Sequence, residues 1–319
     1  AATVTASGLQ TPGGSGTADT FDLLGVAYSY GETGSVMPKN VEEYTVTVTI
    51  SNKNYALAET TAPFNITKAT LTVRVENASI TYGEGAPAYT LVYSGWQYGE
   101  NESEVNASGV TYAYSGQGTS YQAGSDVGIY YVTPAGLTAD NYDFVYSGKG
   151  TLTVNKKQIT LTVTADGKTY DGTAVSVSVT PSDKFGTDEI VYAYAYTWSG
   201  GTFEGTTANC ATNAGEWTVT VTLGEGGKSG NYVLTANGSA QFTIDKASLT
   251  IKFEKGVYTT IYGEQAPGYA LTYSDWVNGE DFSGQLTPVF ATKQGDTNYA
   301  PGAANGSVGE YNVTVTALD

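Results

Sequence analysis

The feature that most constrains this chain is a short motif that returns three times at nearly equal intervals. In each copy a strand-like segment ends at Ile or Val, reaches a lysine two residues later and runs into another strand-like segment. The lysines lie 88 and 90 residues apart, and the copies span 66–73, 154–161 and 244–251. A fixed period of this kind indicates an array of modules. We therefore predict four modules, at residues 1–67, 68–156, 157–246 and 247–319, joined stiffly because no Gly/Pro/Ser linker separates them.

The modules alternate between two kinds. Residues 82–100 and 262–280 align without a gap, and twelve of the 19 positions are identical, among them Trp96 with Trp276 and Glu100 with Glu280. The first and third modules instead share closely spaced alternating tyrosines. The order is therefore A-B-A-B.

Thr alternates with Val or an aromatic residue in every module, most clearly at 44–48, 130–132, 217–221 and 311–315. This period of two is typical of strands with one wet face, and no apolar period long enough for an amphipathic helix occurs. We expect an all-β chain, a linear tandem array of four β-sandwich (Ig-like) or β-grasp-like modules. A module of about 90 residues can bury a small core. Residues 99–104 and 279–283 could add a short helical turn to the B modules.

Both ends of the repeat pattern are incomplete. Module one begins beyond the point where module three has its Tyr170-Asp171-Gly172 turn, and module four reaches Asp319 before an Asn-Tyr pair like Asn141-Tyr142. We expect a missing first strand in module one and a missing last strand in module four. Either the chain is a fragment of a longer array, or neighbouring chains donate these strands head to tail.

These residues carry a family resemblance. The turns at 82–87 and 262–267 resemble the MBG-type (Tyr-Gly-x) repeat of bacterial surface proteins, and 159–244 resembles the YDG repeat around Tyr170-Asp171-Gly172. Module one is similar to an incomplete YDG repeat. The resemblance implies a bacterial cell-surface or secreted protein of stacked β modules with adhesin-like or stalk roles, and it implies no catalytic residues.

Charge excludes two classes of partner. The chain has 14 basic and 31 acidic residues, a net charge of -17. Nucleic acid and anionic lipid surfaces both require clustered Lys and Arg, so we expect neither nucleic-acid binding nor direct membrane insertion. With no histidine and with Cys210 as the only cysteine, the chain also has no Ser-His-Asp triad, no His-ligated metal site and no intrachain disulfide. We expect Cys210 to be a small buried residue.

We expect no enzyme, no catalytic or cofactor-binding residues and no metal site. Two carboxylates can hydrolyse a glycoside, and Glu84 with Glu100 or Glu264 with Glu280 are the candidates. Their repetition within the chain favours a structural role. Calcium stays open at 140–143, at Asp166 with Asp171, and at 296–298, although none fits a calcium-loop spacing and Asx-turns explain the same residues.

Aromatic residues are the best candidates for ligand contact. Tyr192, Tyr194, Tyr196 and Trp198 fall on one face of a predicted strand, where they could stack on sugar rings or form the core of the module. Trp96 and Trp276 are expected in cores.

The first functional hypothesis is a structural stalk that projects a binding region from a bacterial cell, located extracellularly. The second is an adhesin that binds host or environmental glycans or surface proteins through exposed tyrosines. The third is a filament subunit assembled by strand exchange.

Overall fold

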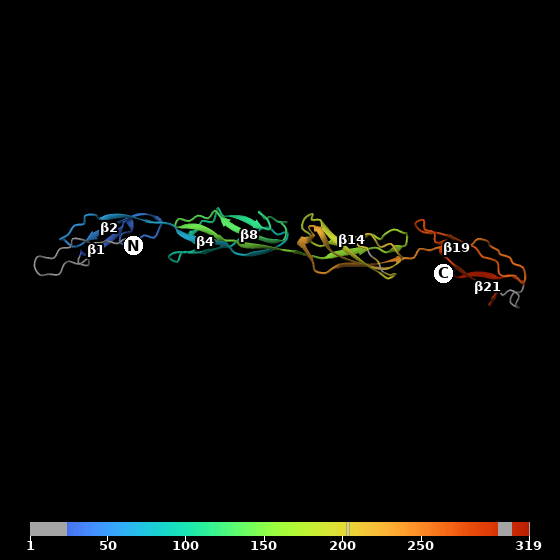
Figure 1. Cartoon of the computed structure of the whole chain (residues 1–319). Coiled ribbons are helices and arrows are strands. Elements are labelled where there is room, and N and C mark those ends of the chain that lie inside the picture. The colour runs from blue at the N-terminus through green and yellow to red at the C-terminus, as the bar shows by residue number, and fades with distance from the viewer. Residues whose placement is uncertain (1–23, 202, 204, 299–307, 319) are drawn as a thin grey trace. The chain divides into compact units, whose positions relative to one another are not determined.

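The structure is a computed structural model that describes residues 24–201, 203, 205–298 and 308–318. These residues form strands in several separate sheets, with short 3-10 turns and no α-helix, so the chain is all-β as its period-2 alternation predicted (Figure 1). Two compact units divide the chain, Ala1–Lys157 and Gln158–Asp319, and each contains two of the predicted modules.

In the first predicted module three strands form one antiparallel sheet in the order β1-β2-β3. Their bounds are Val26–Tyr30, Glu42–Ile50 and Thr61–Ile66, with the 3-10 turn η2 at Gly31–Thr33. The Phe64 ring packs edge-on against Tyr30 and stacked against Tyr44, with ring centroids 5.8 and 5.4 Å apart. The prediction that this module lacks its first strand falls on residues 1–23, which lie outside the described residues.

The second predicted module contains two sheets, ordered β6-β4-β9 and β5-β10-β8-β7. The strands are β4 Ala69–Val75, β5 Ala78–Thr81, β6 Leu91–Ser94, β7 Thr111–Gly116, β8 Gly128–Ala135, β9 Tyr142–Gly148 and β10 Gly150–Asn155. Leu71 and Val73 of one sheet and Val132 and Leu152 of the other are fully buried, because each lies on the inner side of its alternating strand. The arrangement is a sandwich, with the parallel pairs β4–β9 and β5–β10 as its departures from antiparallel pairing.

The third predicted module is built around the longest strand, β16, which spans Gly215–Gly227 and includes the predicted valine strand. One sheet has the order β13-β18-β16-β15, and two further pairs are β12-β14 and β11-β17. The bounds are β11 Lys157–Ile159, β12 Leu161–Ala165, β13 Lys168–Thr169, β14 Val177–Pro181, β15 Ile190–Trp198, η4 Ser229–Asn231, β17 Tyr232–Leu234 and β18 Gly238–Asp245. Val219, Val221 and Trp217 of β16 form the centre of its core, against which Leu161 and Val163 of β12 pack.

The fourth predicted module has two smaller sheets, β19-β20 and β22-β21-β23. The strands are β19 Thr250–Phe253, β20 Leu271–Ser274, β21 Pro288–Gln294, β22 Thr297–Asn298 and β23 Asn312–Leu318. Contrary to the expected small core, no described residue of 247–298 and 308–318 is buried. Phe253 of β19 and Phe290 of β21 pack against each other with ring centroids 6.0 Å apart, but both stay half-buried.

The helical turns expected in the two B modules are 3-10 turns of three residues. They are η3, Glu102–Glu104, and η5, Ser283–Gln285. Asn101 begins the first turn, since its side chain accepts a hydrogen bond from the Ser103 amide. Neither turn is long enough to pack a helix onto a sheet.

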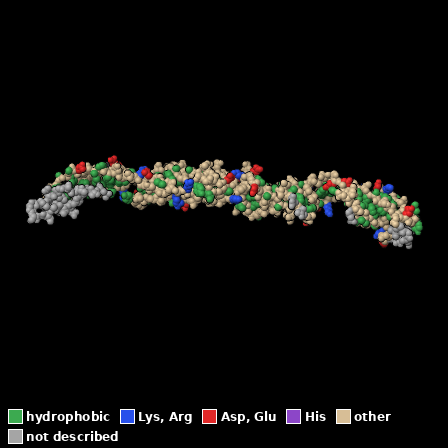
Figure 2. All heavy atoms as spheres, in the orientation of Figure 1, with side chains coloured by type: hydrophobic (Ala, Val, Ile, Leu, Met, Phe, Trp, Pro, Cys, Tyr) green, Lys and Arg blue, Asp and Glu red, His purple; other side chains and the backbone are tan. Residues whose placement is uncertain are grey.

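Surface charge follows the composition. On the face shown in Figure 2, acidic and basic side chains lie scattered among uncharged surface and do not gather into a single patch. The described residues include no helix with the length and apolar character needed to cross a membrane.

Candidate functional site

The predicted aromatic strip lies on β15 and faces the core of the third module. Tyr196 is 8% exposed, and its hydroxyl donates to the carbonyl oxygens of Thr207 and Ala208 at 3.1 and 2.9 Å. The Trp198 ring stacks on Trp217, with centroids 5.4 Å apart and an interplanar angle of 16°. The strip therefore contributes to the core of the module, which was one of the two roles that the sequence allowed for it.

Tyr192 and Tyr194, the other two members of the strip, are half-buried and pack against the same core. Burial raises the pKa of both phenols, because the ionised form loses hydration. Only the outer parts of these rings reach solvent. Ligand contact by the strip stays a prediction.

The two repeated tryptophans differ in one of their two aromatic neighbours. Trp96 packs against Tyr93 and edge-on against Tyr142, with centroids 5.4 and 5.3 Å apart. Trp276 packs against Tyr273 and Phe282, at 6.3 and 5.8 Å. Both tryptophans are half-buried. The two tryptophans thus share an equivalent tyrosine as one neighbour and differ in the other, which is Tyr142 for Trp96 and Phe282 for Trp276.

A tyrosine–carboxylate contact holds a loop in the second module. Tyr142 opens β9 and is 2% exposed; its phenol donates to Glu100 Oε2 and accepts from the Gln97 amide at 2.9 Å. Burial and the hydrogen bond to Glu100 raise the pKa of Tyr142. The contact therefore joins the start of β9 to the loop that carries Trp96.

The third module repeats this contact with different residues. Tyr232 opens β17, donates to Asp188 Oδ2 and accepts from the Phe185 amide at 3.0 Å. Burial, together with the bond to Asp188, raises the pKa of Tyr232 to about 12. The Asn-Tyr pair identified the tyrosine in the sequence, whereas no repeated motif identified Asp188.

The carboxylate of Glu280 accepts a hydrogen bond from a tyrosine hydroxyl of the third module. The donor is Tyr170 of the Tyr-Asp-Gly turn, and this bond raises the pKa of Tyr170. Gly172 has a φ of +74°, and a Cβ there would lie 2.6 Å from Cβ of Asn278. The left-handed backbone and this close approach together explain why the motif has glycine at its third position.

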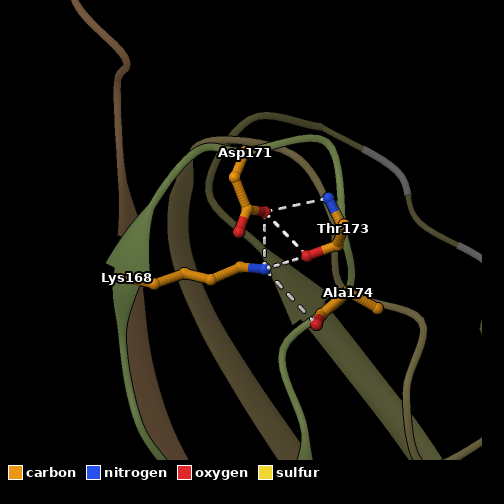
Figure 3. Close-up of polar contacts among 4 residues, drawn as sticks. All are labelled: Lys168, Asp171, Thr173 and Ala174. Carbon is orange, nitrogen blue, oxygen red and sulfur yellow. Dashed lines mark hydrogen bonds and ion pairs between the residues drawn. The ribbon is translucent and has the colours of Figure 1, made fainter. Parts of the chain in front are cut away.

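The rest of the Tyr-Asp-Gly turn is a small polar network (Figure 3). Lys168 Nζ lies 2.7 Å from both Asp171 Oδ1 and Thr173 Oγ1 and also donates to the Ala174 carbonyl oxygen (Figure 3). Asp171 Oδ1 in turn accepts from the Thr173 amide at 2.9 Å, an Asx-turn. The Lys168 ammonium holds the pKa of Asp171 at about 2. The network stabilises the turn from which Tyr170 reaches Glu280.

Three of the four carboxylates in the candidate pairs accept hydrogen bonds from protein groups. Glu84 Oε2 accepts from the Thr81 amide within its own turn at 2.8 Å, while Glu100 and Glu280 each accept a tyrosine hydroxyl. These hydrogen bonds do not place two of the carboxylates opposite each other, as glycoside hydrolysis requires.

Two of the residues proposed for calcium binding make contacts with other protein groups. Asp171 pairs with Lys168, and Asn141 Oδ1 accepts from the Val41 amide at 2.9 Å. Across the described part of the chain no group of three or more His, Cys, Asp or Glu side chains could hold a metal ion. Calcium binding at these positions stays a prediction.

Cys210 is half-buried, not fully buried as expected. Its thiol donates to the Thr207 carbonyl oxygen at 3.2 Å, in the same loop whose carbonyls bind Tyr196.

We predict that Tyr232→Phe lowers the free energy of unfolding of the third module by about 1–3 kcal/mol, because a half-buried carboxylate and a backbone amide lose their partner. Hydrogen exchange of the β16 and β18 amides under native conditions measures this change. Tyr194→Phe is the matched control, since its hydroxyl makes no hydrogen bond with another described residue. Equal effects of the two substitutions would contradict the role of the contact.

Asp171 gives a pH prediction. Its folded pKa lies below its ordinary value of 3.8, so its contribution to stability is present above pH 4 and is lost as pH falls toward about 2. Asp171→Asn should therefore lower the melting temperature at pH 5 and make little difference at pH 2. Thermal melts at both values test this against Asp166→Asn, which removes an exposed carboxylate. A deficit for Asp171→Asn that is independent of pH would argue against the ion pair.

Comparison with known families matches one part of the chain. Residues 71–153 match the MBG domain (YGX type). The matched stretch begins within β4 and ends within β10, so it covers most of both sheets of the second module and the contact between Tyr142 and Glu100. No curated protein matches the chain. The second predicted module is thus supported as an MBG domain of the YGX type.

Proposed function

We propose that this chain is a stalk-type repeat region of a bacterial surface protein, which holds a binding region away from the cell and performs no catalysis. The matched MBG domain is a repeat domain of surface proteins, which supports a structural or adhesive role outside the cell. Alternation of MBG-type and YDG-type modules extends this proposal to the rest of the chain.

The junction between the first two modules is the observation that carries the proposal. β3 ends at Ile66 and β4 begins at Ala69, so two residues separate the last strand of one module from the first strand of the next. Such a short connection has few conformations and transmits orientation from one module to its neighbour.

Side-chain contacts support this junction on two sides. Asn141 accepts from the Val41 amide through Oδ1 and from the Ala69 amide through its backbone oxygen, at 2.9 and 3.0 Å. Lys68 Nζ donates to the Ala139 carbonyl oxygen at 2.8 Å. A stalk needs contacts of this kind, because each module must resist bending relative to the next.

A cation–π contact adds to the same junction. The Lys39 ammonium lies 5.0 Å from the centroid of the Tyr98 ring, which is otherwise exposed to solvent. Contacts of this type contribute about 0.5–1 kcal/mol at exposed sites. Lys39 belongs to the loop before β2, and Tyr98 belongs to the loop that holds Trp96.

We predict that lengthening the junction loosens it. Insertion of Gly-Ser-Gly-Ser between Thr67 and Lys68 should broaden the distance distribution between spin labels at positions 49 and 111 at least about twofold, since flexible linkers of this composition behave as random coil. Pulsed electron–electron double resonance measures this distance distribution, in a Cys210→Ser background so that only the two introduced cysteines carry labels. The same insertion between Thr119 and Ser120, in an exposed loop of the second module, is the control. If the distance distribution of the parent chain is as broad as that of the junction variant, the stalk proposal is wrong.

The second candidate is an adhesin that binds glycans through tyrosines. The observation in its favour is that Tyr192 and Tyr194 are only half-buried, although their faces pack against the core. A glycan array with the whole chain distinguishes the candidates. The stalk proposal expects no saturable retention; retention that Tyr194→Ala abolishes, with the fold intact by circular dichroism, would establish the adhesin.

A further inference from the structure

In the second module the first and the last segment lie side by side and run in the same direction. The first segment, residues 69–81, contains β4 and β5, and the last segment, residues 142–155, contains β9 and β10. β4 pairs in parallel with β9 in one sheet, and β5 pairs in parallel with β10 in the other. The two segments therefore stay paired while both cross from one sheet to the other. We call this contact between the first and the last segment of a module its parallel clamp.

Hydrogen bonds outside the ladders extend the clamp at both of its ends. At the start, the Ala69 amide donates to the Asn141 carbonyl oxygen at 3.0 Å. At the other end, the Tyr82 amide donates to the Asn155 carbonyl oxygen at 2.8 Å, and Asn155 Nδ2 donates to Ser79 Oγ at 2.7 Å. The clamp thus continues one residue beyond the paired strands on each side.

The crossing between the two sheets is bridged as well. The Thr151 amide donates to Asn77 Oδ1 at 3.0 Å. Gly150 lies against the end of β4, where a Cβ on this residue would be 2.6 Å from the Val75 carbonyl oxygen. Two main chains approach this closely only where no side chain intervenes. Glycine therefore keeps the segments in contact at the point where the ladders change sheets.

The third module has the same arrangement between its own ends. Residues 157–169 begin the module with β11 to β13, and residues 232–245 end it with β17 and β18. β13 pairs in parallel with β18. The Tyr170 amide donates to the Asp245 carbonyl oxygen at 2.8 Å, which repeats the bond made by the Tyr82 amide.

Two further contacts complete the clamp of the third module. β11 pairs with β17, and the Thr235 amide just after β17 donates to the Ile159 carbonyl oxygen at 3.2 Å. Gly167 takes the part that Gly150 has in the second module, since a Cβ there would lie 2.5 Å from the Thr243 carbonyl oxygen. Both module types therefore hold their last strand in parallel beside a strand that begins the module.

This pairing determines how a module responds to tension. The chain enters at the start of the first segment and leaves at the end of the last segment, so tension pulls the two segments in opposite directions along their length. Between parallel neighbours, such a load falls on the hydrogen bonds of the ladder together, in shear. Antiparallel neighbours that are pulled from one end separate one pair at a time instead.

We propose that the parallel clamp bears tension along the chain, so that the second and third modules stay folded when the chain is stretched. This role rests on the proposed stalk function, because a stalk that connects a cell to a bound surface is placed under tension. The clamp acts within a module, whereas the junction contacts act between modules. Forced unfolding is governed by the rate at which the folded state opens, and the clamp is the contact that must open first.

Optical tweezers on the whole chain test the direction of the load. In a Cys210→Ser background, handles on cysteines introduced at the exposed positions 67 and 156 pull the second module from its ends. Handles at the exposed positions 108 and 140 pull on the antiparallel pair β7–β8, near the end where β7 begins and β8 ends. The first geometry should need at least about twice the rupture force of the second, because several hydrogen bonds must break together. Equal forces in the two geometries would overturn the proposal.

Substitutions in the same experiment test the clamp itself. Asn77→Ala with Asn155→Ala removes side-chain hydrogen bonds between the two segments, at exposed residues outside the core. The matched control is Asn101→Ala with Asn106→Ala, which removes two side-chain hydrogen bonds from an exposed loop of the same module. The clamp variant should lower the end-to-end rupture force at least about 1.3-fold and the control less than about 1.1-fold. Equal reductions by the two variants would show that the clamp does not carry the load.

Failure of the clamp and failure of the stalk are distinguishable. Handles at positions 67 and 156 load one module, so their rupture force does not depend on the stiffness of the junction between modules. A narrow distance distribution between the spin labels, combined with equal rupture forces in the two geometries, would leave the stalk in place and remove the clamp. A broad distribution combined with a higher end-to-end force would establish the clamp and remove the stiff stalk.

Discussion

Closure of two sheets by one extended segment, in which β9 continues into β10, is the constraint on which the B-type fold depends. β9 and β10 are adjacent in the chain, yet they pair with different sheets, so a single segment of 142–155 determines burial on both sides of the second module. Where it is in place, Tyr82, Leu71 and Leu152 are buried; around β19 and β23, no described residue is. β9 pairs in parallel with β4 and β10 with β5, because the segment runs in one direction alongside the two strands that begin the module.

Tyrosines in this chain act as amphipathic core residues more than as a display surface. Their rings fill the space between sheets, and their hydroxyls satisfy carboxylates and backbone groups of the neighbouring loops, as Tyr142, Tyr196 and Tyr232 do. A tyrosine can pack like phenylalanine and still hold a loop in place. This use helps to order long loops in a chain that has one cysteine and no histidine and whose described residues form no α-helix.

Several features could be predicted from particular residues. Period-2 alternation predicted the strands β2, β16 and β23, and the repeat of Trp96 and Glu100 as Trp276 and Glu280 indicated a structural pair. Exposure could not be predicted in the same way, because Tyr82 and Tyr262 have nearly the same neighbours in sequence but opposite burial. The partners of Tyr170 and Tyr232 were also beyond reach: Glu280 lies 110 residues from Tyr170, and Asp188 belongs to no repeated motif.

The sequence by itself determined the all-β class and predicted the alternation of two module types, because strand alternation and repeat spacing are local properties that each segment carries within itself. Only the tertiary structure decided which strands pair, which aromatic faces are covered and which edges stay open. Those outcomes depend on the contacts that each residue makes with segments far away in the chain, so two nearly identical turns can end in opposite environments.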